Sequence, residues 1–211
     1  MNVLVVGDDE GVFMFNPKTK MELVKFNVQA KAACIIGDEI ICSHKEKPIL
    51  YRKWSNMTQT FKIRKFFHVC DHKPSYKIHR SIQTPRKIIM PGIVDSLCSA
   101  SQGPYFYGSI QNTLYCWDIR TGRCLSTNQA HYQSIKFIKT SKDFTITGSN
   151  DGQIAIYRSF AMAQVHDTLQ PIIVINAHSL PVTDLEIKDD FCFTSSTDFS
   201  IKVMFLGFLL F

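Results

Sequence analysis

Apolar residues in this chain come in short runs separated by turn-forming residues. In the first 26 residues the runs are Val3–Val6, Val12–Phe15 and Met21–Phe26. Runs of this length, bounded by Gly, Asp and Asn, are typical of β-strands joined by tight turns. The same scheme recurs over residues 27–54, and no long segment has the 3.6-residue period of an amphipathic helix. The pattern therefore predicts an all-β protein built from small antiparallel sheets.

The second half of the chain repeats itself. The residues that close three successive units, Trp117, Tyr157 and Met204, lie 40 and 47 residues apart. His131 and His178 open two of these units, and each lies 26 residues before the closing residue. An opening Gly-His-like pair and a closing Trp-Asp-like pair are the layout of a WD repeat, which forms a four-stranded blade of a β-propeller. The spacing thus predicts a WD-repeat propeller.

About five four-stranded blades are expected, as part of a seven-bladed propeller. Their predicted limits are residues 1–26, 27–54, 91–118, 119–157 and 171–204, with a basic insertion at 55–90. After Val203 the chain reads MFLGFLLF, without the turns or alternation of a further blade. We therefore expect one incomplete propeller domain, truncated at its C-terminal end, with an exposed strand edge that favours aggregation.

His, Thr and Asp recur at fixed offsets within the units. The predicted networks are His131, Thr147 and Asp151 before Tyr157, and His178, Thr194 and Asp198 before Met204, with Trp117 closing the preceding unit. An Asp in a turn, a His from the opening loop and a Thr on the neighbouring strand can satisfy one another when buried. The same residue types also build catalytic triads, but a set that recurs once per blade favours a structural role. Gln111 replaces the Asp of the preceding unit and predicts a weaker network there.

Charge is concentrated in one segment. Residues 45–90 hold twelve Lys and Arg and two acidic residues, whereas the rest of the chain is mildly acidic. Basic residues alternate there with Phe and Tyr, and the candidate contacts are Lys62, Arg64, Lys65, Lys73, Lys77, Arg80, Arg86 and Lys87. Such a segment predicts contact with RNA or an acidic protein. A solvated loop explains it equally well.

Several functional classes have no support in the sequence. There is no Gly-rich phosphate loop, no pair of carboxylates in a plausible site and no context for a nucleophile, so no enzyme and no cofactor is expected. His68, Cys70 and His72 lack the two-pair spacing of a zinc site. The N-terminus lacks the basic start of a signal peptide, and seven scattered cysteines indicate a reduced, intracellular protein.

Two phrases go beyond a generic WD repeat. They are AHYQSI at residues 130–135 and HSLPVTD at residues 178–184. With Pro91–Val94 and the unit closed by Trp117, they resemble the WD-repeat subunit family of the Rix complex, or rixosome. The resemblance covers residues 91–204 and implies a nuclear (nucleolar or nucleoplasmic), non-enzymatic scaffold in assembly of the large ribosomal subunit and internal-spacer processing. It also implies a helical-repeat partner subunit, a midasin-type AAA ATPase and the pre-ribosomal particle as partners.

The chain departs from that family at Met204, where an aromatic residue is usual, and in its length. The competing interpretation is a generic WD adaptor, such as a substrate receptor of a ubiquitin ligase or a chromatin or replication module. The two blade-opening phrases favour the ribosome-assembly interpretation, because a generic adaptor has no reason to match both.

Overall fold

The computed structural model describes seventeen strands and one short 3-10 helix. Residues 4–7, 12–15, 18, 20, 22–26, 30–36, 39–44, 50–53, 91–159 and 170–210 are described. The N-terminal strands are β1 (Leu4–Gly7), β2 (Val12–Phe15), β3 (Glu22–Phe26), β4 (Ala30–Ile36), β5 (Glu39–His44) and β6 (Leu50–Lys53). They are followed by β7 (Ser96–Ser99), β8 (Tyr105–Ile110), β9 (Thr113–Asp118), β10 (Arg123–Asn128), β11 (Ile135–Thr140) and β12 (Phe144–Ser149). The last are β13 (Gln153–Arg158), β14 (Ile173–Asn176), β15 (Val182–Lys188), β16 (Phe191–Ser196), β17 (Ile201–Phe205) and the 3-10 helix η1 (Gly207–Leu210).

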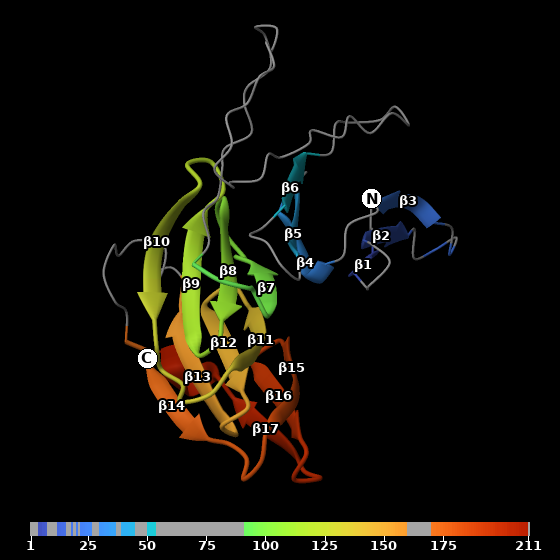
Figure 1. Cartoon of the computed structure of the whole chain (residues 1–211). Helices are drawn as coiled ribbons and strands as arrows, with labels where there is room; N and C mark the ends of the chain where they lie inside the picture. Colours follow the sequence, from blue (N-terminus) through green and yellow to red (C-terminus); the bar gives the residue numbers. More distant parts are fainter. Residues whose placement is uncertain are drawn as a thin grey trace, which may run out of the picture.

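The strands form five antiparallel sheets in chain order. β7–β10 and β11–β14 are four-stranded, and β1–β3, β4–β6 and β15–β17 have three strands among the described residues. The first strand of each sheet contacts the first strand of the next, along the series β1, β4, β7, β11 and β15 (Figure 1). Sheets that stack through their first strands in this way are the blades of a β-propeller. The predicted all-β, WD-repeat fold is confirmed.

The sheets are offset by one strand from the predicted repeat units. β10 pairs with β9, although the predicted units place it after residue 118 in the next blade. β14 likewise pairs with β13, although it lies after residue 171. For β10 the physical reason is that residues 119–122 form a short turn, which returns the chain to the edge of the sheet it has just left. The predicted limits therefore mark repeat units, and the sheets run from 96 to 128 and from 135 to 176.

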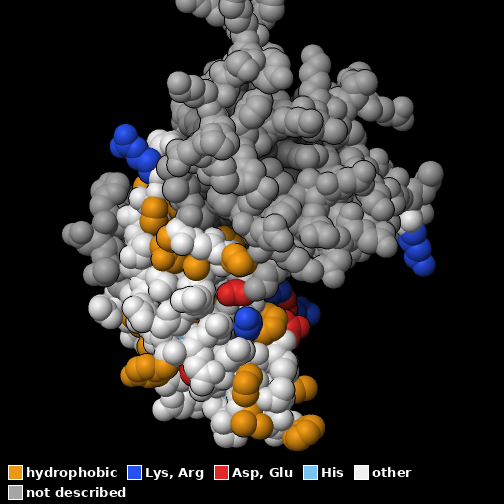
Figure 2. Space-filling model, viewed as in Figure 1, with side chains coloured by type: hydrophobic (Ala, Val, Ile, Leu, Met, Phe, Trp, Pro, Cys, Tyr) orange, Lys and Arg blue, Asp and Glu red, His pale blue; other side chains and the backbone are white. Residues whose placement is uncertain are grey.

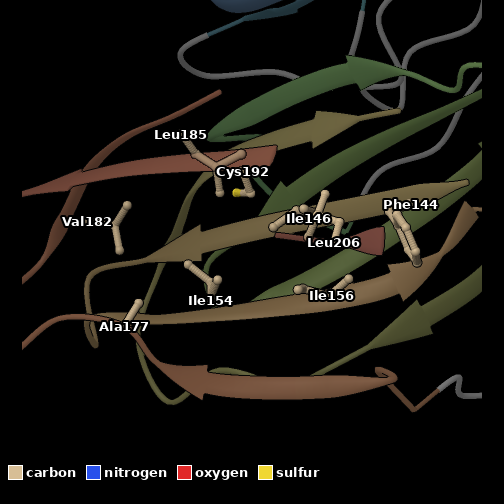
Figure 3. Packing of buried hydrophobic residues seen from close by; sticks show 9 residues of the cluster. All are labelled: Phe144, Ile146, Ile154, Ile156, Ala177, Val182, Leu185, Cys192 and Leu206. Carbon is tan, nitrogen blue, oxygen red and sulfur yellow. The ribbon is translucent and has the colours of Figure 1, made fainter. Parts of the chain in front are cut away.

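Apolar cores fill the spaces between neighbouring sheets. Between β11–β14 and β15–β17 the core consists of Phe144, Ile146, Ile154, Ile156, Ala177, Val182, Leu185, Cys192 and Leu206 (Figure 3). A second core lies between β7–β10 and β11–β14 and includes Tyr107, Leu114, Ile135 and Tyr157. Burying each large apolar side chain contributes roughly 1.5–3 kcal/mol. Stacking of one sheet on the next is therefore the main source of stability.

The C-terminal residues pack against the last two sheets. Leu206 is buried, and its main-chain N donates a 2.7 Å hydrogen bond to the main-chain O of Asp190. Ile119 and Ser159 make the matching bonds in the preceding sheets, to Pro104 and Asp143. Residue 206 therefore occupies the regular position that follows a closing strand. Among the described residues, no helix has the length and apolar character needed to cross a membrane.

Candidate functional site: the repeated histidine networks

The two predicted histidine networks are assembled by equivalent elements of neighbouring sheets. His131 lies in the loop between β10 and β11, Thr147 on β12, and Asp151 in the turn between β12 and β13. This turn contains Gly152, whose φ of 77° is readily adopted only by glycine. The turn brings the Asp151 carboxylate back toward the opening loop of the same sheet.

In the sheet β11–β14, His131 bridges the turn and the neighbouring strand. Its Nδ1 lies 3.2 Å from Oδ2 of Asp151, and its Nε2 lies 2.8 Å from Oγ1 of Thr147. The Asp151 carboxylate also accepts 2.9 Å hydrogen bonds from the main-chain N of Tyr132 and of Gln153. One carboxylate therefore joins the opening loop, the histidine and the turn.

The His131 ring is buried, and this determines its protonation. Burial lowers the pKa of His131 below its ordinary value, because desolvation of the imidazolium outweighs the opposing effect of Asp151. A carboxylate only accepts hydrogen bonds, so the neutral ring carries its proton on Nδ1 and donates it to Asp151. Nε2 is then an acceptor for the Thr147 hydroxyl. All polar atoms of the ring are satisfied, with none directed at a substrate.

The sheet β15–β17 repeats this geometry with one addition. His178 Nδ1 lies 3.0 Å from Oδ2 of Asp198, and its Nε2 lies 2.9 Å from Oγ1 of Thr194. Ser200 adds a 2.6 Å hydrogen bond from its hydroxyl to Oδ1 of Asp198. This hydroxyl bond, together with main-chain donors from Ser200 and Ser179, holds the pKa of the Asp198 carboxyl well below its usual range. The structure thus brings together both predicted sets in the same way.

The sheet β7–β10 has no such network. Trp117 is fully buried and stacks on Phe106 and Tyr115, with both ring centroids 5.2 Å away. Its indole Nε1 is buried and has no hydrogen-bond partner among the described residues. Gln111 stands where the other two sheets have Asp. Its main-chain O accepts a 2.8 Å hydrogen bond from the main-chain N of Ile135 in the next sheet. The closing Trp therefore acts here through packing, and the turn serves to hold the following sheet.

Three hydrogen-bonding residues near the networks were not among the predicted site residues. The Tyr157 phenol donates to Asn128 on β10, a strand of the preceding sheet. Ser149 and Ser196 each donate to a main-chain O of the loop that opens their own sheet, Gln133 and Leu180. The two serines do carry a signal, because both precede the turn aspartate by two residues. Asn128 carries none.

The other candidate residues divide by location. Lys62, Arg64, Lys65, Lys73, Lys77, Arg80, Arg86 and Lys87 lie outside the described residues, as do His68, Cys70 and His72. Within the described part of the chain, no group of three His, Cys, Asp or Glu residues is placed to hold a metal ion. Burial raises the pKa of the Cys116 and Cys192 thiols to about 12, so both are protonated at neutral pH. Neither is an activated nucleophile.

Comparison with known proteins identifies relatives for about half of the chain. No family model matches it. WD repeat-containing protein 18 of Danio rerio is 32% identical over 114 residues, which are 52% of this chain and 26% of that protein. The pre-rRNA-processing protein pro-1 of Caenorhabditis elegans is 33% identical over 134 residues, 62% of this chain and 24% of that protein. The pre-rRNA-processing protein IPI3 of Yarrowia lipolytica is 24% identical over 124 residues, which are 56% of this chain and 29% of that protein.

This chain is a homologue of these proteins over the matching residues. The predicted resemblance to the WD-repeat subunit family of the Rix complex is confirmed over the matching half. The chain spans about a quarter of the length of the curated relatives it matches.

Solved structures show the same fold at low sequence identity. The computationally designed Ika8 protein superposes with a TM-score of 0.64 and 20% identity, covering 97% of this chain and 56% of that one. The designed Ika4 protein gives a TM-score of 0.59 and 19% identity, and the superposition covers 86% of this chain and 94% of that one. At this identity the likeness concerns the fold alone.

Proposed function

We propose that this chain is a non-enzymatic WD-repeat scaffold that acts in nuclear assembly of the large ribosomal subunit and in processing of an internal spacer of pre-rRNA. The supporting observation is its homology to proteins named for pre-rRNA processing in a nematode and a yeast. The buried networks support the non-enzymatic part. Their histidines are buried and hydrogen-bonded at both ring nitrogens within the sheet, which suits a rigid platform and leaves no base facing a substrate.

The proposed mechanism is presentation of loops on a rigid framework. Stacked sheets hold the opening loops in place, and loops on a rigid scaffold commonly carry binding function. Tyr132 is 85% exposed beside the buried His131, and Leu180 is exposed beside the buried His178. These exposed residues are the proposed contacts with protein partners, which include a helical-repeat subunit and a midasin-type AAA ATPase. The pre-ribosomal particle is the proposed common target.

Affinity purification of the tagged protein from nuclei tests this function. Large-subunit precursors and a helical-repeat protein are expected to co-purify, and depletion is expected to leave spacer-extended ribosomal RNA. The Tyr132→Lys variant is expected to recover less of the partner, while Lys142→Ser, at an exposed position outside the opening loops, serves as the matched control. Recovery of a ubiquitin-ligase core without ribosomal precursors would favour the generic adaptor instead.

Direct contact between the basic segment and RNA is a separate part of the proposal. Replacing Lys62, Arg64 and Lys65 with Ser removes three positive charges. The slope of the logarithm of the RNA-binding constant against the logarithm of the salt concentration should then become less steep by up to about 2 for single-stranded RNA. Replacing the exposed Lys142, Lys188 and Lys202 with Ser removes the same charge elsewhere. Equal RNA binding and equal salt slopes for the two variants would end the proposed RNA contact.

A further inference from the structure

The turns between the second and third strands of β7–β10 and β11–β14 each contact the opening loop of the next sheet. Asn112, Gly152 and Phe199 occupy the same place in this turn of successive sheets, five residues before the closing residue. Gly152 and Phe199 have positive φ values of 77° and 64°. At Asn112 and Gly152 the contact is with the main chain of the histidine that opens the following sheet.

The first of these turns holds the loop that opens β11–β14. Nδ2 of Asn112 donates a 3.1 Å hydrogen bond to the main-chain O of His131. Where the same loop enters β11, the main-chain N of Ile135 donates to the main-chain O of Gln111. One turn of the preceding sheet therefore fixes the loop near both of its ends.

The second turn contacts two loops at once. The Asp151 carboxylate accepts a 2.9 Å hydrogen bond from the main-chain N of Tyr132, in the opening loop of its own sheet. The main-chain O of Gly152 accepts a 2.9 Å hydrogen bond from the main-chain N of His178, in the opening loop of the next sheet. The two main chains approach so closely that a β-carbon on Gly152 would collide with the main-chain O of His178.

These hydrogen bonds form a continuous series across three sheets. Turn residues and histidines alternate along it, in the order Asn112, His131, Asp151 with Gly152, His178 and Asp198. Asp151 and Gly152 share a peptide bond, so a movement of the turn that releases one loop also displaces the acceptor of the other. The two histidine networks thus meet at a single turn.

We propose that the turn at Asp151 and Gly152 couples the two opening loops, residues 130–134 and 177–181, so that they are ordered or loosened together. Opening of one loop then lowers the free energy needed to open the other. Asp151 is a positioning residue for the second loop, on which it acts through Gly152. Asn112 has the same role for the first loop.

The coupling concerns two exposed side chains. Tyr132 and Leu180 are 85% and 48% exposed, one in each loop. Figure 2 shows exposed hydrophobic side chains at the end of the molecule that β15–β17 and the loop before them form. A partner that orders one loop would favour binding at the other. The assignment of these residues as partner contacts rests on the proposed function, whereas the coupling is a property of the chain alone.

Hydrogen exchange of single main-chain amides, measured on the full 211-residue chain without a partner, tests the coupling. In Asp151→Ala the amide of Tyr132 loses its acceptor directly. The amides of His178 and Ser179 donate to Gly152 and Asp198 in the wild type. They are expected to exchange at least about fivefold faster in Asp151→Ala than in the control variant Tyr157→Phe. That control removes another buried hydrogen bond and corrects for a general loss of stability.

A milder variant covers the case in which Asp151→Ala does not fold. Asp151→Asn retains one acceptor oxygen, and its exchange rates at His178 and Ser179 are expected to lie between those of the control and of Asp151→Ala. Rates equal to those of Tyr157→Phe in both variants would overturn the coupling and leave the proposed function untouched. Coupled loops in a protein that recovers no ribosomal precursors would instead contradict the proposed function alone.

The preceding turn is tested in the same way. Asn112→Ala removes the hydrogen bond to the main-chain O of His131, and the amide of Tyr132 is expected to exchange faster. Gln111→Ala keeps the main-chain acceptor for Ile135 and should leave that amide unchanged. Equal exchange at Tyr132 in the two variants would overturn the positioning role of Asn112.

Discussion

The phenol of Tyr157 donates a 2.9 Å hydrogen bond to Oδ1 of Asn128, and both residues are buried. Tyr157 lies on β13 of the sheet β11–β14, whereas Asn128 ends β10 of the preceding sheet. A residue that the repeat marks as the end of one unit therefore links two sheets. The bond lies beside the apolar core that Tyr107 and Ile135 share with Tyr157.

Removing this phenol should destabilise the contact between the two sheets. In Tyr157→Phe the buried Asn128 oxygen is left without its donor, which costs about 1–3 kcal/mol. Urea unfolding at neutral pH measures the loss. Tyr132→Phe deletes the same hydroxyl at an 85% exposed position and should leave stability unchanged. Equal midpoints for the two variants would show that the Asn128 bond contributes nothing.

The Asp151 carboxylate is expected to stabilise the fold without serving any chemistry. Asp151→Ala removes the acceptor for His131, Tyr132 and Gln153 and should cost about 1–3 kcal/mol. Asp151→Asn retains one acceptor oxygen and should lose less. Thermal melting compares the three proteins. A variant that melts like the wild type but no longer co-purifies with pre-ribosomes would contradict the structural role.

Burial of His131 should make stability depend on pH. Its folded-state pKa lies below the value of about 6.5 in the unfolded chain. As the pH falls, the unfolded chain therefore takes up a proton at this ring before the folded chain does. The stability that the neutral, buried ring contributes is fully present above about pH 6.5 and is lost as the pH falls below that value. His131→Gln should give a flatter fall in unfolding free energy from about pH 7.5 to 5.5. Parallel curves for variant and wild type would refute this.

Gly152 should tolerate no side chain. Gly152→Ala places a β-carbon against the main chain of His178 and forces a non-glycine residue to a φ of 77°, which should destabilise by more than about 1 kcal/mol. Phe199→Gly makes the reverse change, from a side chain to glycine, in the equivalent turn of the last sheet. No loss is expected there, because relief of the left-handed conformation offsets the greater flexibility of glycine in the unfolded chain. Chemical unfolding of both variants makes the comparison.

The C-terminal residues should contribute to the core. Leu206→Ala removes a side chain that is buried between the last two sheets and should cost about 2–5 kcal/mol. Phe208→Ala, two residues later at a 57% exposed side chain, should change stability by less than about 0.5 kcal/mol. Calorimetry of the two proteins measures the difference. Similar melting of both would mean that Leu206 is not packed as the structure shows.

The fold class, the repeat and the histidine networks of this protein follow from the order of its residues alone. Those features depend on spacing: Asp151 and Asp198 occur at one offset from their closing residues, and a sheet with short hairpins places equal offsets at equal positions. The two blade-opening phrases also pointed to the relatives that comparison found. Each of these inferences uses residues that are close in sequence or that recur with one period.

The pairing of strands into sheets and the burial of their faces depend on contacts between distant parts of the chain. β10 and β14 follow the closing residues in sequence, yet each pairs with the outer edge of the sheet before it. Phe144 and Phe191 have the same side chain at equivalent positions, but one is buried beneath the next sheet and the other is exposed. Local pattern encodes the apolar face of a strand, and burial of that face depends on what the rest of the fold places against it.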